Sequence, residues 1–386
     1  MKSDKTTPNV PTLRFREFTD GWRLMPLKKL LCFQNGINAD SDKYGKGVKF
    51  ISVSDILNNQ YITYDCIKGL IDIDEKTMEK FLVEYGDMLF QRSSETFEDI
   101  GRANVYLDKE HPATFGGFVI RGKKISEYNP LFFRYLLCTP NARKQTVRMG
   151  AGAQHYNIGQ DGLGKISLYF PAIQEQQKIA AFLSAIDDRI AVQNKIIEDL
   201  KVLKKELNYS LIGRIINGKS SNCKIEDVID YEQPTNYIVK SDKYIENGET
   251  PVLTANKAFL LGYTIENEGV YNKSDCIILD DFTLDFKYVN FPFKIKSSAI
   301  KILTAKKDIE LRYFYEYLLF LGLTSHEHKR HYISEIAPLP LYLPSIDEQR
   351  NALSALNSIS EKIKVEENYI IALKAQKCFF LRAMFI

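Results

Sequence analysis

The chain has 386 residues, of which 45% are hydrophobic and 26% charged. At about 150 residues per domain, this length predicts two to three domains of ordinary globular composition. The 52 basic and 49 acidic residues leave a net charge of +3, so any nucleic-acid site must be local. No apolar run reaches the roughly 18 residues of a membrane span, and the charged start of the chain predicts no signal peptide.

Six cysteines are spread along the chain without a Cys-x-x-Cys pair, at positions 32, 66, 138, 223, 276 and 378. This spacing predicts neither a zinc site nor a disulfide framework. Free thiols in a reducing compartment fit the pattern, so we expect a cytoplasmic protein.

Residues 1–170 are expected to form a mixed β/α domain. Runs rich in β-branched and aromatic residues predict strands at 49–53, 86–90 and 166–170. Glycine, asparagine and aspartate residues between such runs mark the turns.

The segment 171–216 is predicted to be one long helix. It begins with Pro171 and has Glu175 and Gln176 in its first turn, which suits a helix N-terminus. Its apolar residues then alternate at spacings of four and three, the period of a coiled coil. The seam includes Leu183, Ile186, Ile190, Ile197 and Leu200, with polar interruptions at Gln193 and Lys204.

Residues 217–343 predict a second mixed domain, because several of its segments match the first. Segments 251–254 and 274–278 correspond to the predicted strands 49–53 and 86–90. Further downstream, 314–319 corresponds to 132–137, 330–332 to 154–156, and 339–343 to 166–170.

The segment 344–386 repeats 171–213 at a constant offset of 173, with 12 of 43 positions identical. It has the same start, with Pro344, Glu348 and Gln349, and polar interruptions at the same places, Glu366 and Lys377. Two unrelated amphipathic helices would not share all three features, so we predict an internal repeat. Its seam includes Leu356, Ile359, Ile363, Ile370 and Leu373.

These features resemble the specificity subunit (HsdS) of type I restriction-modification enzymes. The resemblance rests on the two Pro-x-Ile-x-Glu-Gln helix starts, at 171–176 and 344–349, and on their coiled-coil continuations. Supporting segments lie at 11–22, 86–90 and 280–283. The resemblance covers the whole chain, and two such helix starts behind two variable domains make it specific.

The resemblance implies an α+β (mixed α/β) fold with a pseudo-twofold repeat. Two target recognition domains, 1–170 and 217–343, would alternate with two helices, 171–216 and 344–386, that pair as an antiparallel coiled coil. Each domain would read one half of an asymmetric, bipartite site in double-stranded DNA. The helices would set the gap between the half-sites, and their seam residues would serve helix pairing and subunit docking.

The resemblance also implies partners. Two methyltransferase subunits would dock on the helices and methylate adenine at N6, and two motor and nuclease subunits would complete a restriction enzyme. S-adenosylmethionine, ATP and magnesium are expected on those partners. No cofactor, metal ligand or catalytic residue is expected on this chain.

Base sequence is read by polar side chains that reach base edges, so polar residues in expected loops are the candidates for DNA contact. In the first domain these are Gln91, Arg92, Ser93, Ser94, Arg102, Gln154 and His155. In the second domain they are Thr254, Asn256, Lys257, Thr283, Lys287, Lys329, Arg330 and His331.

Charge is divided unevenly between the two domains. Residues 1–170 carry 24 basic and 20 acidic residues, whereas residues 217–343 carry 15 and 18. Phosphate contacts normally dominate DNA affinity, so a net-negative domain is unusual for a DNA reader. Either its basic residues gather on one face, or partner subunits supply much of the phosphate contact.

Two alternatives remain open. The first is a stand-alone DNA-binding or scaffold protein without an enzyme partner. The second is an enzyme, because Gly213–Ser220 matches the phosphate-loop pattern and Asp281 with Asp285–Lys287 faintly resembles a nuclease motif. The phosphate-loop motif follows a predicted helix, whereas a functional phosphate loop follows a strand. A third pattern, the histidines at 326, 328 and 331, fits a polar loop better than a metal site.

Overall fold

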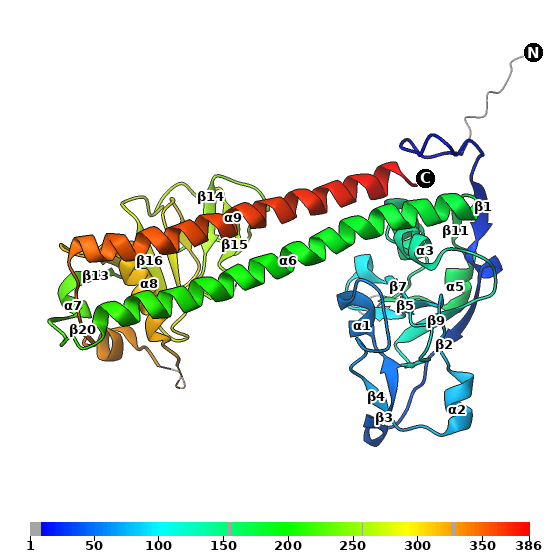
Figure 1. Ribbon diagram of the computed structural model, residues 1–386, viewed down its shortest axis with the longest axis horizontal. Helices are drawn as coiled ribbons and strands as arrows, with labels where there is room; N and C mark the ends of the chain where they lie inside the picture. Colours follow the sequence, from blue (N-terminus) through cyan, green and yellow to red (C-terminus); the bar gives the residue numbers. More distant parts are fainter. Residues whose placement is uncertain (1–8, 153–155, 257, 326, 328) are drawn as a thin grey trace, which may run out of the picture. The chain divides into compact units, whose positions relative to one another are not determined.

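The computed structural model describes residues 9–152, 156–256, 258–325, 327 and 329–386. The chain divides into two compact units, Met1–Asn194 with Asn368–Ile386, and Lys195–Glu367. Each unit holds one mixed α/β domain and one end of each of two long helices (Figure 1). Over the described residues, no helix combines the length and apolar character needed to cross a membrane.

A four-stranded antiparallel sheet forms the centre of the first domain. Its strand order is β2–β9–β5–β7, so the strand that comes last in sequence lies between the first two. All four residues of β5 are buried, as the apolar run at 88–90 favours. The strands are β2 (Leu31–Asn35), β5 (Met88–Gln91), β7 (Ala103–Val105) and β9 (Val119–Lys124).

Three smaller strand groups complete this domain. In the first, β3 pairs antiparallel with β4 and parallel with β8. The second ties the beginning of the domain to its end, because β1 pairs with β11, the strand that precedes the first long helix. The third is the pair β6–β10. The strands are β1 (Arg23–Pro26), β3 (Tyr44–Ile51), β4 (Leu70–Ile71), β6 (Ser93–Ser94), β8 (Thr114–Phe115), β10 (Tyr156–Asn157) and β11 (Ser167–Phe170).

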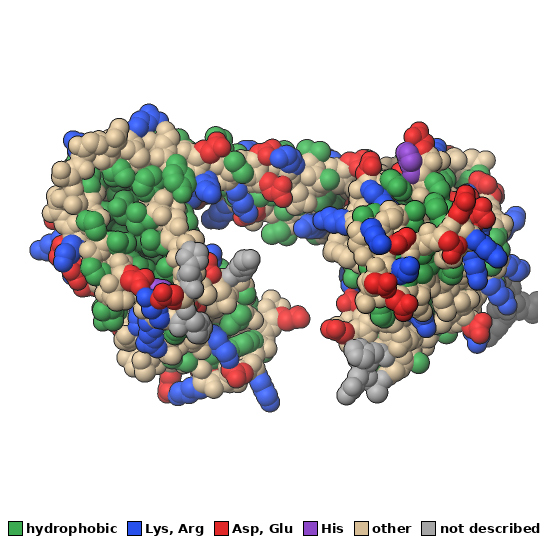
Figure 2. All heavy atoms as spheres, turned by 90° about the horizontal axis from the view of Figure 1, so that it is seen from below, with side chains coloured by type: hydrophobic (Ala, Val, Ile, Leu, Met, Phe, Trp, Pro, Cys, Tyr) green, Lys and Arg blue, Asp and Glu red, His purple; other side chains and the backbone are tan. Residues whose placement is uncertain are grey.

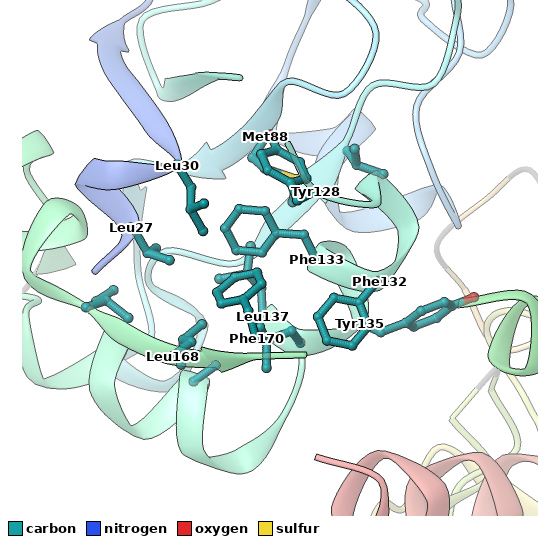
Figure 3. Close-up of a cluster of buried hydrophobic side chains, with 14 of the residues drawn as sticks. Leu27, Leu30, Met88, Tyr128, Phe132, Phe133, Tyr135, Leu137, Leu168 and Phe170 are labelled. Carbon is teal, nitrogen blue, oxygen red and sulfur yellow. The ribbon is translucent and has the colours of Figure 1, made fainter. Parts of the chain in front are cut away.

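Helix α3 supplies much of the core of the first domain. Asn129 caps it by accepting a hydrogen bond from the Phe132 amide at 2.9 Å, and Pro130 occupies its first position. Its rings at 132 and 133 point into the cluster of buried side chains in Figure 3, where Phe133 lies 5.2 Å from Phe170 between ring centroids. The helices are α1 (Val53–Asn58), α2 (Glu75–Lys80), α3 (Pro130–Leu137), α4 (Pro140–Arg148) and α5 (Gln160–Lys165), with 3-10 turns at Leu27–Lys29, Ser41–Lys43 and Phe97–Asp99.

The second domain repeats this topology. Its central antiparallel sheet has the order β13–β19–β16–β17, and β14 pairs antiparallel with β15 and parallel with β18. The pair β12–β20 ties the beginning of this domain to its end. The strands are β12 (Cys223–Lys224), β13 (Ile229–Glu232), β14 (Thr250–Leu253), β15 (Leu260–Thr264), β16 (Cys276–Asp280), β17 (Phe286–Val289), β18 (Lys294–Ile295), β19 (Ile300–Ala305) and β20 (Pro340–Leu341).

Helical elements of the second domain are α7 (Ile225–Val228) and α8 (Leu311–Leu321), with a 3-10 turn at Pro234–Tyr237 and a π-helical turn at Tyr332–Ile336. Helix α8 ends at Gly322, whose φ of +59° closes a left-handed cap that glycine adopts without strain. Strands β3 and β14 hold equivalent places in the two domains, as do β5 and β16 and helices α3 and α8. The predicted mixed α+β fold with an internal repeat is therefore confirmed.

The two long helices are α6 (Ile173–Ile216) and α9 (Ile346–Ala383), and both begin with the same contact. Gln176 donates to the Pro171 carbonyl at 2.9 Å and accepts from the Asn129 amide at 2.9 Å. Gln349 donates to the Pro344 carbonyl at 2.9 Å and accepts from the Glu310 amide at 2.8 Å. Because residues 129 and 310 precede α3 and α8, each glutamine ties a long helix to the main helix of its own domain.

The preceding glutamates differ between the copies. Glu175 is buried, receives two hydrogen bonds of 2.7 Å from the Arg14 guanidinium, and accepts from the Trp22 indole. This ion pair raises the pKa of Arg14. Glu348 instead caps its own helix by accepting from the backbone amide of Ser345 at 2.9 Å, which lowers its pKa.

The long helices run antiparallel. In the first unit, Ile179, Leu183 and Ile186 of α6 share a buried cluster with Met384 near the end of α9. In the second unit, the last turns of α6 share a cluster with the first turns of α9. Figure 1 shows the same pairing for the green α6 and the orange to red α9. The N-terminal part of each helix therefore packs with the C-terminal part of the other.

The two lysines that interrupt the apolar seam each form an ion pair with a carboxylate. Lys377 pairs with Asp187 of α6, which also accepts from the Tyr135 hydroxyl at 2.8 Å. Its repeat equivalent Lys204 pairs at 2.7 Å with Glu316 of α8, which is 1% exposed. Each lysine thus binds a buried carboxylate in its own unit, so the interruptions fix the register of helix against helix or helix against domain.

Candidate DNA-recognition surface

Four first-domain candidates lie at the end of the buried strand β5 and just after it. Gln91, the last residue of β5, is 6% exposed and donates to the Ser93 carbonyl at 2.8 Å, so its side chain holds the backbone that follows the strand. Arg92 is half-buried and donates to the Gly117 carbonyl at 3.3 Å. Ser93 and Ser94 are half-buried, in strand β6, which pairs with β10. The structure brings these four residues together.

A hollow of about 440 Å³ opens beside them. Its walls include Gln91, Ser93 and Ser94, two acidic residues from the next loop, and Phe118, which is 69% exposed at the turn between β8 and β9. Arg102 follows this loop and pairs with Asp99 at 2.6 Å. Phe118 is not among the predicted contact residues, because the residue type alone does not distinguish an exposed aromatic side chain from a buried one. Gln154 and His155 lie outside the described residues.

The second domain places its candidates in three loops. Thr254 directly follows strand β14, but its side chain is only 6% exposed. Asn256 is exposed in the following loop and accepts from the Ala258 amide at 3.1 Å, while Lys257 lies outside the described residues. Thr283 is exposed between β16 and β17, and Lys287 is half-buried on β17.

Asp281 joins two of these loops. It is 1% exposed and accepts hydrogen bonds from the backbone amides of His331 at 3.1 Å and Tyr332 at 2.6 Å. Buried Lys301 lies 3.6 Å from its other oxygen. This carboxylate holds the segment at 329–332 against the loop that carries Thr283. Asp281, the first residue of the faint nuclease motif, therefore makes a buried structural contact.

The three basic candidates at 329–331 have different environments. Lys329 is exposed and pairs with Glu327 at 2.6 Å and Glu335 at 2.9 Å, which raises its pKa. Arg330 is exposed and lies over the Phe282 ring. His331 is 3% exposed; its Nδ1 lies 2.7 Å from Glu335 and its Nε2 lies 2.8 Å from the Ser325 hydroxyl.

Of the described candidates, Gln91, Thr254 and His331 offer no exposed side chain to DNA in this structure. The side chains of Gln91 and His331 bind groups within their own loops. Among the other candidates, Arg102, Asn256, Thr283, Lys329 and Arg330 are exposed, and Arg92, Ser93, Ser94 and Lys287 are half-buried. Figure 2 shows basic and acidic side chains side by side on the visible face of each domain. Direct DNA contact stays a prediction for the residues that remain accessible.

The phosphate-loop motif is the C-terminus of a helix. Helix α6 continues to Ile216, and Gly218 follows it with a φ of +71°. The next element is strand β12, which begins at residue 223, so no helix starts directly after the glycines. The motif therefore lacks the strand–loop–helix geometry that binds phosphate. His326 and His328 lie outside the described residues, and among the residues that the structure does describe there is no cluster of three metal-ligand side chains.

The predicted seam residues are withdrawn from solvent. Leu183, Ile186, Ile197, Leu356, Ile363, Ile370 and Leu373 are buried, and Ile190, Leu200 and Ile359 are half-buried. Helix packing accounts for these side chains, so a partner subunit would need other, exposed positions on the helices.

Residues 20–202 match the family model described as "Type I restriction modification DNA specificity domain". This match covers just under half of the chain, and the similarity to type I specificity subunits extends to the following relatives. It is 40% identical over 139 residues to the EcoR124I/EcoR124II specificity subunit of Escherichia coli, a match that covers 34% of each protein. It is 22% identical over 399 residues to the putative MjaX specificity subunit of Methanocaldococcus jannaschii, covering 93% of this chain and 91% of that protein.

Solved structures of specificity subunits share this fold. The type I S subunit from M. genitalium superposes with a TM-score of 0.56 at 15% identity, covering 98% of this chain and 99% of that one. A second structure is described as concerning complex assembly and conformational transition of the type I R-M system. It superposes with a TM-score of 0.56 at 14% identity, and the match covers 94% of this chain and 96% of that one. The matched model is thus described as a DNA specificity domain, and both relatives carry the name of a specificity subunit of a type I restriction enzyme.

Proposed function

We propose that this chain is a type I specificity subunit and that it reads an asymmetric, two-part DNA sequence, one part with each domain. The observation that carries this proposal is the repeated topology: both domains have the same strand order and the same glutamine contact to a long helix. Their accessible candidate residues nevertheless differ, with Ser93, Ser94 and Arg102 in one domain and Asn256, Thr283 and Arg330 in the other. Two similar frames with different reading loops suit two different half-sites.

The long helices would set the gap between the half-sites. Helix α6 has 44 residues without a break, which corresponds to about 66 Å. Base pairs are regularly spaced along a duplex, so the distance between two DNA-reading domains determines the number of base pairs between their half-sites.

Methyltransferase subunits would dock on exposed apolar positions of these helices. Val192 of α6 is 60% exposed, and its repeat equivalent Val365 of α9 is 58% exposed. Ile196 and Tyr369, one turn further along each helix, are again equivalent and are each 38% exposed. Exposed apolar residues repeated at the same offset fit two copies of one partner.

The docking proposal is tested with Val192→Asp and Val365→Asp. Each charge should weaken binding of one methyltransferase copy, and the double variant should bind neither in a pull-down, while the unfolding transition changes little. Asp199→Asn, an exposed change on α6, serves as control. Full binding of two copies by the double variant would contradict these docking positions.

Partner subunits would also hold much of the DNA backbone at the second domain. Several of its lysines are already paired, among them Lys294 with Glu266 at 3.2 Å and Lys273 with Glu232 at 2.9 Å. These ion pairs and the net-negative charge of the domain leave few of its lysines for phosphate contacts, which is why we assign those contacts to partner subunits. In the proposed complex, the methyltransferases hold S-adenosylmethionine and methylate adenine at N6, and two motor and nuclease subunits use ATP and magnesium. The complex would act in the cytoplasm.

The proposed function is tested by adenine-methylation sequencing of a methylation-free host that expresses this chain with the methyltransferase of its system. We expect a split motif, with two short defined blocks separated by a fixed run of unspecified bases. Methylation at one continuous motif would contradict two-domain reading. Soluble protein that neither methylates DNA nor co-purifies with the methyltransferase would favour the scaffold alternative.

A further inference from the structure

Three arginines line one pocket of the first domain, which has a volume of about 270 Å³. Arg102 immediately precedes β7, Arg134 lies on α3 and Arg143 lies on α4, so three separate elements contribute one guanidinium each. Among the described residues that line this pocket none is acidic, and the rim includes the exposed thiol of Cys138.

The guanidinium groups keep free donors. Arg134 donates from Nε to Asn104 at 3.2 Å, and within the described part of the chain its two terminal nitrogens make no hydrogen bond. Arg143 donates from one terminal nitrogen to the carbonyls of Glu98 at 2.8 Å and Ile100 at 2.7 Å. These backbone contacts fix the orientation of Arg143 without neutralising its charge.

The positive charge of the pocket is only partly balanced. Arg102 pairs with Asp99 at 2.6 Å, which is the carboxylate next to the pocket. Burial, together with the charge of Arg102, lowers the pKa of Arg143. An anion placed among the three side chains would relieve this repulsion, and paired guanidinium forks match the oxygens of a phosphate group.

The pocket is connected to the candidate reading loop. Asp99 lines the hollow beside Ser93 and Ser94, and the same carboxylate pairs with Arg102 in the arginine pocket. Arg143 holds the backbone of that loop on both sides of Asp99. A group bound in the pocket would therefore act on the position of the loop that offers polar side chains to bases.

We propose that Arg102, Arg134 and Arg143 form a phosphate-binding pocket that receives a backbone phosphate of the DNA beside the bases read by the first domain. This inference rests on the proposed function, because DNA is the source of the phosphate. Phosphate contacts position a reader on the duplex and base contacts specify the sequence, so the pocket sets the register of the reading loop. A free phosphate compound is the other source of the same chemistry, and the test separates the two.

The first arm of the test is a thiol footprint on the full chain in its methyltransferase complex. A small alkylating reagent is applied with no addition, with inorganic pyrophosphate, or with target duplex, and each cysteine is read by mass spectrometry. We expect target duplex to slow alkylation of Cys138 several-fold and pyrophosphate to leave it unchanged. Exposed Cys32 on β2 is the internal control. Protection by pyrophosphate alone would assign the pocket to a free phosphate compound, and protection by neither would overturn the proposal.

The second arm measures the salt dependence of DNA affinity for Arg134→Gln, Arg134→Lys and the control Lys76→Gln, an exposed change on α2. Losing one phosphate contact lowers the slope of log affinity against log salt by about 0.9. We expect this loss for the glutamine variant, on target and non-target DNA equally, and a slope near wild type for the other two. Equal slopes for all proteins, while methylation of a split motif persists, would overturn the pocket and leave the proposed function standing.

Discussion

Gln176 and Gln349 show how a single residue type serves the same purpose twice. Each lies in the first turn of a long helix, is 5% and 0% exposed respectively, and uses both ends of its amide. A glutamate could accept the amide hydrogen bond but could not donate to the proline carbonyl. The Glu-Gln pair of the helix start is therefore a contact between helix and domain as well as an N-terminal signal.

Gln176→Ala or Gln349→Ala should each destabilise the fold by about 1–3 kcal/mol, because a buried amide and a buried carbonyl lose their partners. Urea unfolding followed by far-UV circular dichroism measures this loss. Gln177→Ala, an exposed change next to the first site, should stay within about 0.5 kcal/mol of wild type. Equal stability of all three variants would show that the glutamine contact does not hold the helices to their domains.

Protonation of His331 makes the stability of the second domain depend on pH. Its hydrogen bond with Glu335 raises its pKa from the ordinary value of 6.5, although burial and the charge of Lys329 oppose the shift. The folded state then binds the proton more tightly than the unfolded chain. Its contribution to stability is fully present below about pH 6.5 and is lost as pH rises through the folded pKa.

Glu335→Gln should accordingly reduce the difference in unfolding free energy between pH 6 and pH 8.5, since the variant lacks the carboxylate that favours the charged imidazole. Urea unfolding at the two pH values measures the difference, with exposed Glu246→Gln as control. An unchanged pH dependence in Glu335→Gln would rule out this ion pair as its source.

At the scale of elements, the sequence predicts the repeated helices and strands, but it does not predict which loop residues come together on the surface. Helical periodicity and an offset of 173 predict both long helices, and matched segments predict equivalent strands in both domains, because burial imposes a regular pattern on sequence. The loops carry no such pattern. Asp281 accepts a hydrogen bond from the amide of His331, which lies fifty residues further along the chain. The pocket arginines come from three separate elements. The roles of these residues therefore depend on tertiary contacts.

Lengthening both long helices by one heptad should lengthen the gap of the target. Duplicating residues 188–194 in α6 and the repeat-equivalent 361–367 in α9 keeps the seam period and adds about 10 Å. That corresponds to about three base pairs of unspecified sequence at 3.4 Å each. Methylation sequencing of the double insertion checks this, and an unchanged gap would refute spacing by the helices. Insertion in α6 alone should disrupt pairing and methylation.

At the scale of the whole molecule, each unit carries its own core, its own sheets and one end of each helix. Within each unit the glutamine contact joins domain to helix through residues that do not belong to the exposed loops. Domains joined to their helices in this way should be exchangeable between specificity subunits, because a new set of loops leaves the helix contacts intact.

The most direct test of two-domain reading is to replace residues 217–343 with the second domain of a specificity subunit whose target is known, and to sequence adenine methylation in a methylation-free host. We predict that one half-site becomes that of the donor while the other half-site and the gap remain unchanged. A change in both half-sites, or in neither, would contradict the account that each domain reads its own part of the DNA.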